Sequence, residues 1–164
     1  MIQPGEFLFP NNVVGLLPIA FQAIDPDLFI TKRPLRNTDP TQSIGVFGQL
    51  WDPDEESKEM HGFSTGEPTL QQYLISIQAF VKDRDPERGL STHSILSAHI
   101  RRVLYNDPEL RVALAGLAST DEWVTETLKR WGVRVQRYFS NEIDSDWLYL
   151  STLEFWIETE TETR

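Results

Sequence analysis

The chain contains no cysteine among its 164 residues. This absence excludes a disulfide scaffold, a cysteine-based zinc site and a thiol nucleophile. It also fits assembly in a reducing compartment. The length is typical of one domain and is large enough to bury a core without disulfides or metals. We therefore predict a single domain over residues 1–164.

Long apolar runs and an excess of cations are also missing. No apolar run approaches the roughly 20 residues that a membrane-spanning helix needs, and residues 1–6 lack the basic region of a secretory signal. The chain has 15 Lys and Arg against 25 Asp and Glu, so its net charge is −10. A protein that grips nucleic-acid phosphates carries a basic patch. We expect no membrane association and no tight hold on DNA, although the protein could surround DNA without holding it.

The most regular part of the sequence is residues 70–104. Apolar side chains occupy the odd positions from Tyr73 to Val81, which is typical of a half-buried strand. Asp85 and Pro86 then form a helix start, with an acid in the first turn. The predicted helix runs to residue 104, and its apolar stripe comprises Ile95, Leu96, Ile100, Val103 and Leu104.

The remaining elements are shorter or less regular. Asn12 is a plausible N-cap for an apolar helix that ends near residue 24 and contains Pro18. The sequence also predicts an irregular arm at 1–11, a short apolar segment at 112–118, a tail at 159–164 that frays, and strands at 28–31, 43–51, 125–139 and 147–157. The last two strands predict an antiparallel hairpin. The fold class is therefore α+β, a mixed or mostly antiparallel sheet packed by two helices.

Alternation along these elements predicts one core between sheet and helix. We expect eight side chains to be buried together there: Ile77, Val81, Leu96, Ile100, Val133, Val135, Leu153 and Phe155.

A long acidic loop at 52–68 separates two of the strands. Its acids are Asp52, Asp54, Glu55, Glu56 and Glu59. The spacing and the glycine of a calcium-binding EF-hand loop are absent, so a solvated loop is the better interpretation. We expect this loop to be mobile and to carry no catalytic group.

One catalytic pattern occurs within that loop. Residues 62–66 read G-F-S-T-G, the G-x-S-x-G pattern in which Ser64 would be a nucleophile. Asp83 or Asp85 would then serve as the acid, and His93 or His99 as the base. The pattern needs a strand before it and a helix after it, and neither is predicted here. The two histidines lie six residues apart on different helix faces, so we expect them to be solvent-facing or capped.

The predicted hairpin carries a candidate subunit interface. Trp156 lies between Glu154 and Glu158, and an exposed tryptophan there would suit an interface. Arg130 and Arg134 lie on the partner strand. Cross-strand pairing with Glu154 or Glu158 would explain them, at about 0.2–1 kcal/mol per pair.

Five stretches resemble the tail terminator proteins of long-tailed, siphovirus-type bacteriophages, most closely those of actinobacteriophages. They are IQAFVKD at 77–83, ERGLSTHS at 87–94, RRVLY at 101–105, RWGVRVQRY at 130–138 and WLYLSTLEF at 147–155. The likeness covers about residues 70–158 and lies in framework residues, not in a catalytic signature.

This resemblance implies a hexameric ring that caps the finished tail tube and joins it to the head, with DNA passing through. It implies no enzymatic activity and no cofactor, and the residue spacings give no metal site. The implied partners are further copies of the chain, the major tail tube protein and the head–tail connector or stopper protein. The implied location is the head-proximal end of the virion tail, after assembly in the bacterial cytoplasm. The candidate interface and lumen residues are Asp52, Asp54, Glu55, Glu56, Glu59, Arg130, Arg134, Glu154, Trp156 and Glu158.

Three alternatives remain open on the sequence. The chain could be another head–tail connector or minor tail protein, a small serine hydrolase that uses Ser64, or a plain acidic binding module. Oligomeric state separates the ring protein from the binding module, and the activity of a Ser64→Ala variant tests the hydrolase.

Overall fold

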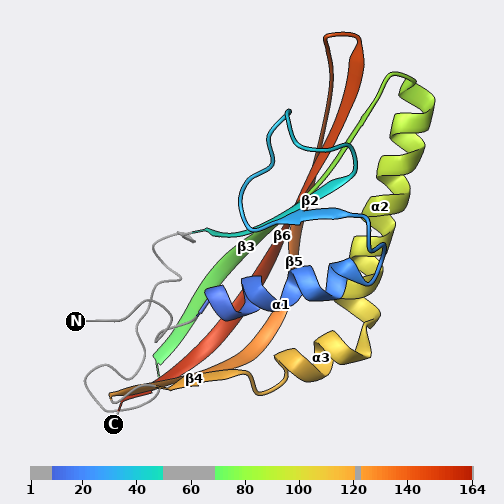
Figure 1. Cartoon of the computed structure of the whole chain (residues 1–164). Coiled ribbons are helices and arrows are strands. Elements are labelled where there is room, and N and C mark those ends of the chain that lie inside the picture. Colours follow the sequence, from blue (N-terminus) through green and yellow to red (C-terminus); the bar gives the residue numbers. More distant parts are fainter. Residues whose placement is uncertain (1–8, 50–68, 121–122, 164) are drawn as a thin grey trace.

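The structure is a computed structural model that describes residues 9–49, 69–120 and 123–163 (Figure 1). In these residues three helices pack on one face of a curled six-stranded sheet, in the strand order β1-β2-β3-β6-β5-β4. The elements are α1 (Asn11–Gln22), β1 (Phe29–Thr31), β2 (Ser43–Gln49), β3 (Thr69–Asp83), α2 (Pro86–Asn106), α3 (Pro108–Leu114), β4 (Ala118–Thr120), β5 (Val124–Ile143) and β6 (Asp146–Thr163). β1 runs parallel to β2 and every other neighbouring pair is antiparallel, so the predicted α+β class and mixed sheet are confirmed.

The pairing of β3 with β6 forms the centre of the sheet. Fifteen consecutive residues of β3 pair with β6 without a register break, from Thr69 opposite Thr161 to Asp83 opposite Trp147. Side chains alternate between the two faces along each strand. The odd positions of both strands therefore face the helices together, and the even positions share the face that carries no helix.

The core lies between the odd face of the sheet and the helices. Six of the eight predicted core residues are buried: Ile77, Val81, Leu96, Ile100, Leu153 and Phe155. Val133 is partly buried and packs against the same cluster. The side chain of Val135 lies outside the described residues. The predicted core is thus confirmed on β3, α2 and β6, where the spacing of apolar residues is regular.

Helices α2 and α3 both begin with the sequence Asp-Pro-Glu, in which the aspartate is the N-cap. The Asp85 carboxylate accepts hydrogen bonds from the backbone N–H groups of Glu87 (3.0 Å) and Arg88 (3.5 Å) at the start of α2. Asp107 does the same for Glu109 (2.9 Å) at the start of α3. The prediction of two helices was therefore wrong, because Asp107 and Pro108 start a third helix that runs into the predicted apolar segment at 112–118.

The ends of α1 and β6 also differ from the prediction. α1 begins at Asn11 after Pro10, so Asn12 lies inside the first turn and is not the N-cap. The helix continues through Pro18. β6 continues to Thr163, and Thr159 is fully buried, so the described part of the predicted frayed tail is a strand. Pairing with both β3 and β5 holds this segment in the sheet.

The predicted facing of α2 was wrong at two positions. Ile95 was expected in the apolar stripe but is 57% exposed. His93 was expected to be solvent-facing or capped but is buried against the sheet. The two residues lie about 200° apart around the helix at 100° per residue, so burial of one requires exposure of the other.

The loop between β1 and β2 covers part of the helix-free face. Arg33 donates two hydrogen bonds to Asp39, at 2.6 and 3.0 Å, and this holds the pKa of Asp39 down at about 2. The backbone N–H of Leu35 donates to the Gln78 side chain at 2.8 Å. A Cβ at position 45 would lie 2.8 Å from the Arg33 carbonyl oxygen, so Gly45 permits this close approach.

We predict that Ile100→Ala lowers the free energy of unfolding by about 2–5 kcal/mol, because it empties a site that is only 3% exposed. Ile95→Ala is the matched control on the same helix, and its effect should stay within about 0.5 kcal/mol. Urea denaturation of both variants measures the difference. Equal losses at the two positions would contradict the observed facing of α2.

Candidate assembly surface

The β5–β6 hairpin extends to one end of the molecule, beside the start of α2 (Figure 1). The pairing of β2 with β3 ends at Phe80 of β3. The pairing of β5 with β6 continues to Ile143 and Asp146. Asp144 and Ser145 turn the chain with positive φ values of 52° and 69°. The hairpin therefore reaches beyond β2, and it passes the last pair of β3 with β6, Asp83 with Trp147, by one residue pair and the turn.

The outer edge of β5 is open over most of its length. β4 pairs only with residues 125–127, and no strand among the described residues lies along the edge from residue 129 to 143. Register shifts interrupt β5 between Leu128 and Arg130 and between Val133 and Val135. Bulges and charged residues discourage edge-to-edge pairing there. From Gln136 onward the strand has no register shift, and its charged residues are Arg137 and Glu142.

Exposed apolar side chains gather beside this regular part of the edge. Tyr138 is 63% exposed, Phe139 57% and Leu90 of α2 54%. A hollow of about 240 Å³ lies among seven residues: Leu90, His93, Tyr138, Phe139, Ser140, Tyr149 and Leu150. Contiguous exposed apolar patches are typical of interaction sites.

Contacts to α2 hold the hairpin in place. The Tyr149 hydroxyl donates to the carbonyl oxygen of Pro86 at 2.8 Å, at the first turn of α2. Arg101, about four turns further along α2, donates to the Gln136 side chain at 3.0 Å. Gln136 thus faces the helices. Simple alternation from Trp131 would place Gln136 on the opposite face, but the second bulge, between Val133 and Val135, reverses the alternation. The hairpin is therefore a braced projection and not a free arm.

A buried polar cluster lies beneath the same hairpin. His93 Nε2 lies 3.2 Å from the Ser151 hydroxyl, which lies 3.3 Å from the hydroxyl of Ser97. The imidazole also contacts the rings of Tyr138 and Tyr149, each with a centroid distance of 6.3 Å. Burial lowers the pKa of His93, which favours the neutral ring. The cluster satisfies polar groups between α2 and β6 without exposing the hydroxyls.

Asp83, Asp85 and His93, three of the residues assigned to a serine hydrolase, have other partners, whereas the buried Nδ1 of His99 has no hydrogen-bond partner among the described residues. Asp83 accepts two hydrogen bonds from Arg88, at 2.7 and 2.8 Å, which hold the pKa of Asp83 down at about 2. Asp85 caps α2, and His93 bonds to Ser151 and not to either aspartate. Ser64 lies outside the described residues.

Nine of the ten predicted interface and lumen residues fall into three groups. Arg130 pairs with Glu158 at 2.9 Å, as predicted, and the Gln72 amide donates to the same carboxylate at 3.0 Å. Arg134 lies at the second bulge, exposed, and Glu154 is half-buried opposite Ser76. The five loop acids lie outside the described residues: Asp52, Asp54, Glu55, Glu56 and Glu59.

Trp156, a candidate interface residue, is half-buried within the subunit. It lies opposite Gly132, and a Cβ at that position would meet the indole ring at 3.0 Å. The tryptophan therefore lies over a cross-strand glycine. The contact with Gly132 therefore covers part of the apolar surface of Trp156 within the subunit.

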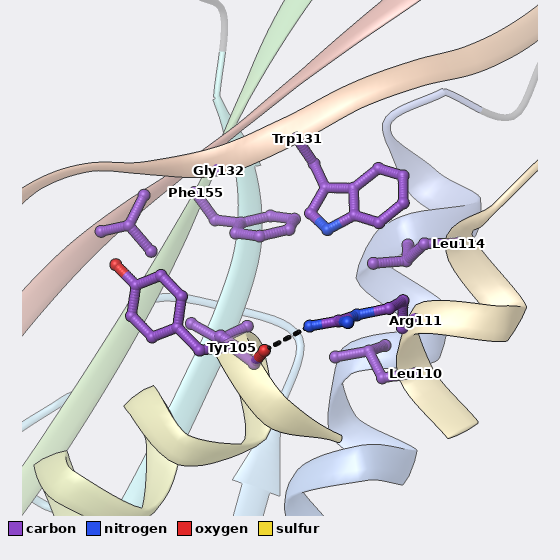
Figure 2. A pocket seen from close by; sticks show the side chains of 9 residues that line it. Tyr105, Leu110, Arg111, Leu114, Trp131, Gly132 and Phe155 are labelled. Carbon is purple, nitrogen blue, oxygen red and sulfur yellow. Dashed lines mark hydrogen bonds between the residues drawn. The ribbon is translucent and has the colours of Figure 1, made fainter. Parts of the chain in front are cut away.

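A second pocket lies on the helix side of β5 (Figure 2). It has a volume of about 140 Å³ and is lined by Leu104, Tyr105, Leu110, Arg111, Leu114, Trp131, Gly132, Val133 and Phe155. Arg111 donates to the carbonyl oxygen of Tyr105 at 2.7 Å (Figure 2). The lining offers no carboxylate, histidine or hydroxyl pair for acid–base chemistry. The pocket is a packing gap between α2, α3 and β5.

Residues 9–49, 69–120 and 123–163 contain no group of three or more potential metal ligands. None of the described helices has the length and apolar character needed to cross a membrane.

The sequence matches no protein-family model and no curated protein. The case for a function therefore rests on the residues, their arrangement and the resemblance described above.

We predict that the free energy of unfolding falls as the pH drops from 7 to 5, and that His93→Gln flattens this dependence. The folded-state pKa of His93 is lowered below the unfolded value of about 6.5. The neutral His93 side chain therefore makes its full contribution to the free energy of unfolding above about pH 6.5. This contribution is lost as the pH falls, at up to about 1.4 kcal/mol per pH unit. Asp39 and Asp83, whose pKa values lie at about 2, lose their contributions at lower pH. An unchanged slope in His93→Gln would contradict this assignment.

Proposed function

We propose that this protein is a bacteriophage tail terminator that forms a ring, caps the finished tail tube and joins it to the head. The main support for this proposal is the position of the five resembling stretches in the fold. They fall on β3, both halves of α2, β5 and β6, which are the longest elements of the fold. The likeness therefore concerns a connected framework and not scattered segments.

The arrangement of the exposed surface supports a subunit that works in contact with others. The braced hairpin presents an open strand edge beside Tyr138, Phe139 and Leu90. A free subunit with such an edge risks nonspecific pairing. A ring gives every subunit a neighbour on each side. The six-fold number comes from the family resemblance alone.

The charge balance supports a conduit for DNA. A net charge of −10 repels phosphates, so duplex DNA would pass through the ring without being retained. Glu158 contributes little free charge to a lumen, because Arg130 and Gln72 bind its carboxylate. Glu154, the end of β6 and the acids at 52–59 remain the lumen candidates.

The proposed partners are the major tail tube protein on one side and the head–tail connector or stopper protein on the other. The proposed activity is structural, without a catalytic step or cofactor. Another connector or minor tail protein would share much of this chemistry. Location at the head-proximal end of the tube separates the terminator from those alternatives.

Loss of the protein should leave phage heads and tails unjoined. We expect a nonsense codon early in the gene to yield separate filled heads and tails in lysates, and the plasmid-borne wild-type gene to restore complete virions. Electron microscopy and plaque counts measure both outcomes. Normal virions from the nonsense mutant would refute the proposal.

The protein should show negligible affinity for duplex DNA at about 0.15 M salt, where the Debye length is about 8 Å. The physical reason is the lack of a matching set of cations to displace counterions from the phosphates. Fluorescence anisotropy with a labelled duplex measures the affinity. Tight, salt-sensitive binding would contradict the conduit role.

A further inference from the structure

A groove lies where the C-terminal ends of α1 and α2 meet the start of α3. Its volume is about 270 Å³, and it is lined by Ala20, Ala23, Ile24, Arg102, Val103, Asn106, Asp107 and Pro108. The floor is largely apolar. Asp107 is already engaged, because its carboxylate caps α3. Arg102 is exposed, and its guanidinium makes no hydrogen bond or ion pair within the described part of the chain.

The hairpin tip has the complementary character. Ile143 is 37% exposed at the end of β5. Glu142 and Asp144 flank it, and both are exposed. Neither carboxylate has an ion-pair partner among the described residues, whereas the nearby Asp146 faces Arg84 at 3.8 Å. The tip thus offers one apolar side chain between two free negative charges.

The tip and the groove of one subunit cannot meet. The tip is braced beside Pro86 at the start of α2, whereas Arg102 and Val103 lie near its end. At about 1.5 Å per residue, roughly 25 Å of rigid helix separates the two sites. A contact between them must therefore join two copies of the chain.

We propose that the β5–β6 tip of one subunit docks into the α1–α2–α3 groove of the next subunit. Ile143 enters the apolar floor, and Glu142 and Asp144 face Arg102 at the rim. The two surfaces are different parts of the same molecule, so the contact is head-to-tail and generates a ring when the rotation closes. This inference rests on the proposed function, because it supplies the subunit contact of the proposed ring.

Cysteine cross-linking tests the contact directly, because the natural chain has no cysteine. Ile143→Cys and Ala23→Cys are introduced into one full-length chain, which is then oxidised. We expect a ladder of disulfide-linked oligomers on non-reducing gels. The matched control pairs Ile143→Cys with Ala115→Cys, an exposed alanine just after α3 and outside the groove. A ladder from the control alone, from both pairs equally, or from neither would overturn the proposal.

Charge reversal tests the polar part of the contact in the same cross-linking background. Glu142→Arg should slow ladder formation about fivefold, the effect of about 1 kcal/mol expected for a surface charge pair. Arg102→Glu should do the same, and the chain that carries both reversals should recover. Mixing the two single-reversal chains should also restore cross-linking, because alternating subunits match every tip with a complementary groove. Failure of both rescues would overturn the proposed pairing.

The outcome is separable from the proposed function. Particles with the ring at the tail junction but without the cross-link would refute this contact alone. A cross-linked ladder from a protein that is absent from the tail would refute the tail assignment and leave the contact standing.

Discussion

The unbroken pairing of β3 with β6 is the constraint on which the rest of the structure depends. It sets fifteen residues in one register and thereby places every odd side chain of both strands on the helix face. A slip by one residue would turn the whole apolar set away from the helices. The same register brings Ser151 beneath His93 and aligns Tyr149 with the first turn of α2. The brace that holds the hairpin is therefore a consequence of this ladder.

Regular periods made much of this fold predictable from the sequence. Alternation in β3 and β6 and the Asp85 cap gave the main strands, α2 and most of the core. Local irregularities caused the failures. The bulges in β5 reversed its alternation, and a bulge leaves no mark on a simple pattern of apolar residues. The third helix carried a readable signal, because Asp107 repeats the Asp-Pro-Glu start of Asp85.

The candidate surface was harder to predict than the core. Trp156 is a candidate interface residue because glutamates flank it in sequence, and the sequence alone did not predict its cross-strand contact with Gly132, which half-buries it. The pairing of Arg130 with Glu158 was predictable, since it needs only the hairpin register. The apolar groove and the tip that complements it come from elements distant in the sequence. Only their placement at opposite ends of α2 shows that such a contact must be intermolecular.

We propose a subunit whose exposed hairpin and groove are completed by neighbouring copies, in a protein whose net charge of −10 disfavours retention of DNA. The central claim of this account is the place of that assembly in a virion. Cryo-electron microscopy of intact particles tests this claim most directly. The account predicts a six-fold ring of this chain between the last tail-tube ring and the head connector, with DNA or an open lumen on its axis. Density for this chain elsewhere in the particle, or its absence from the particle, would contradict the account.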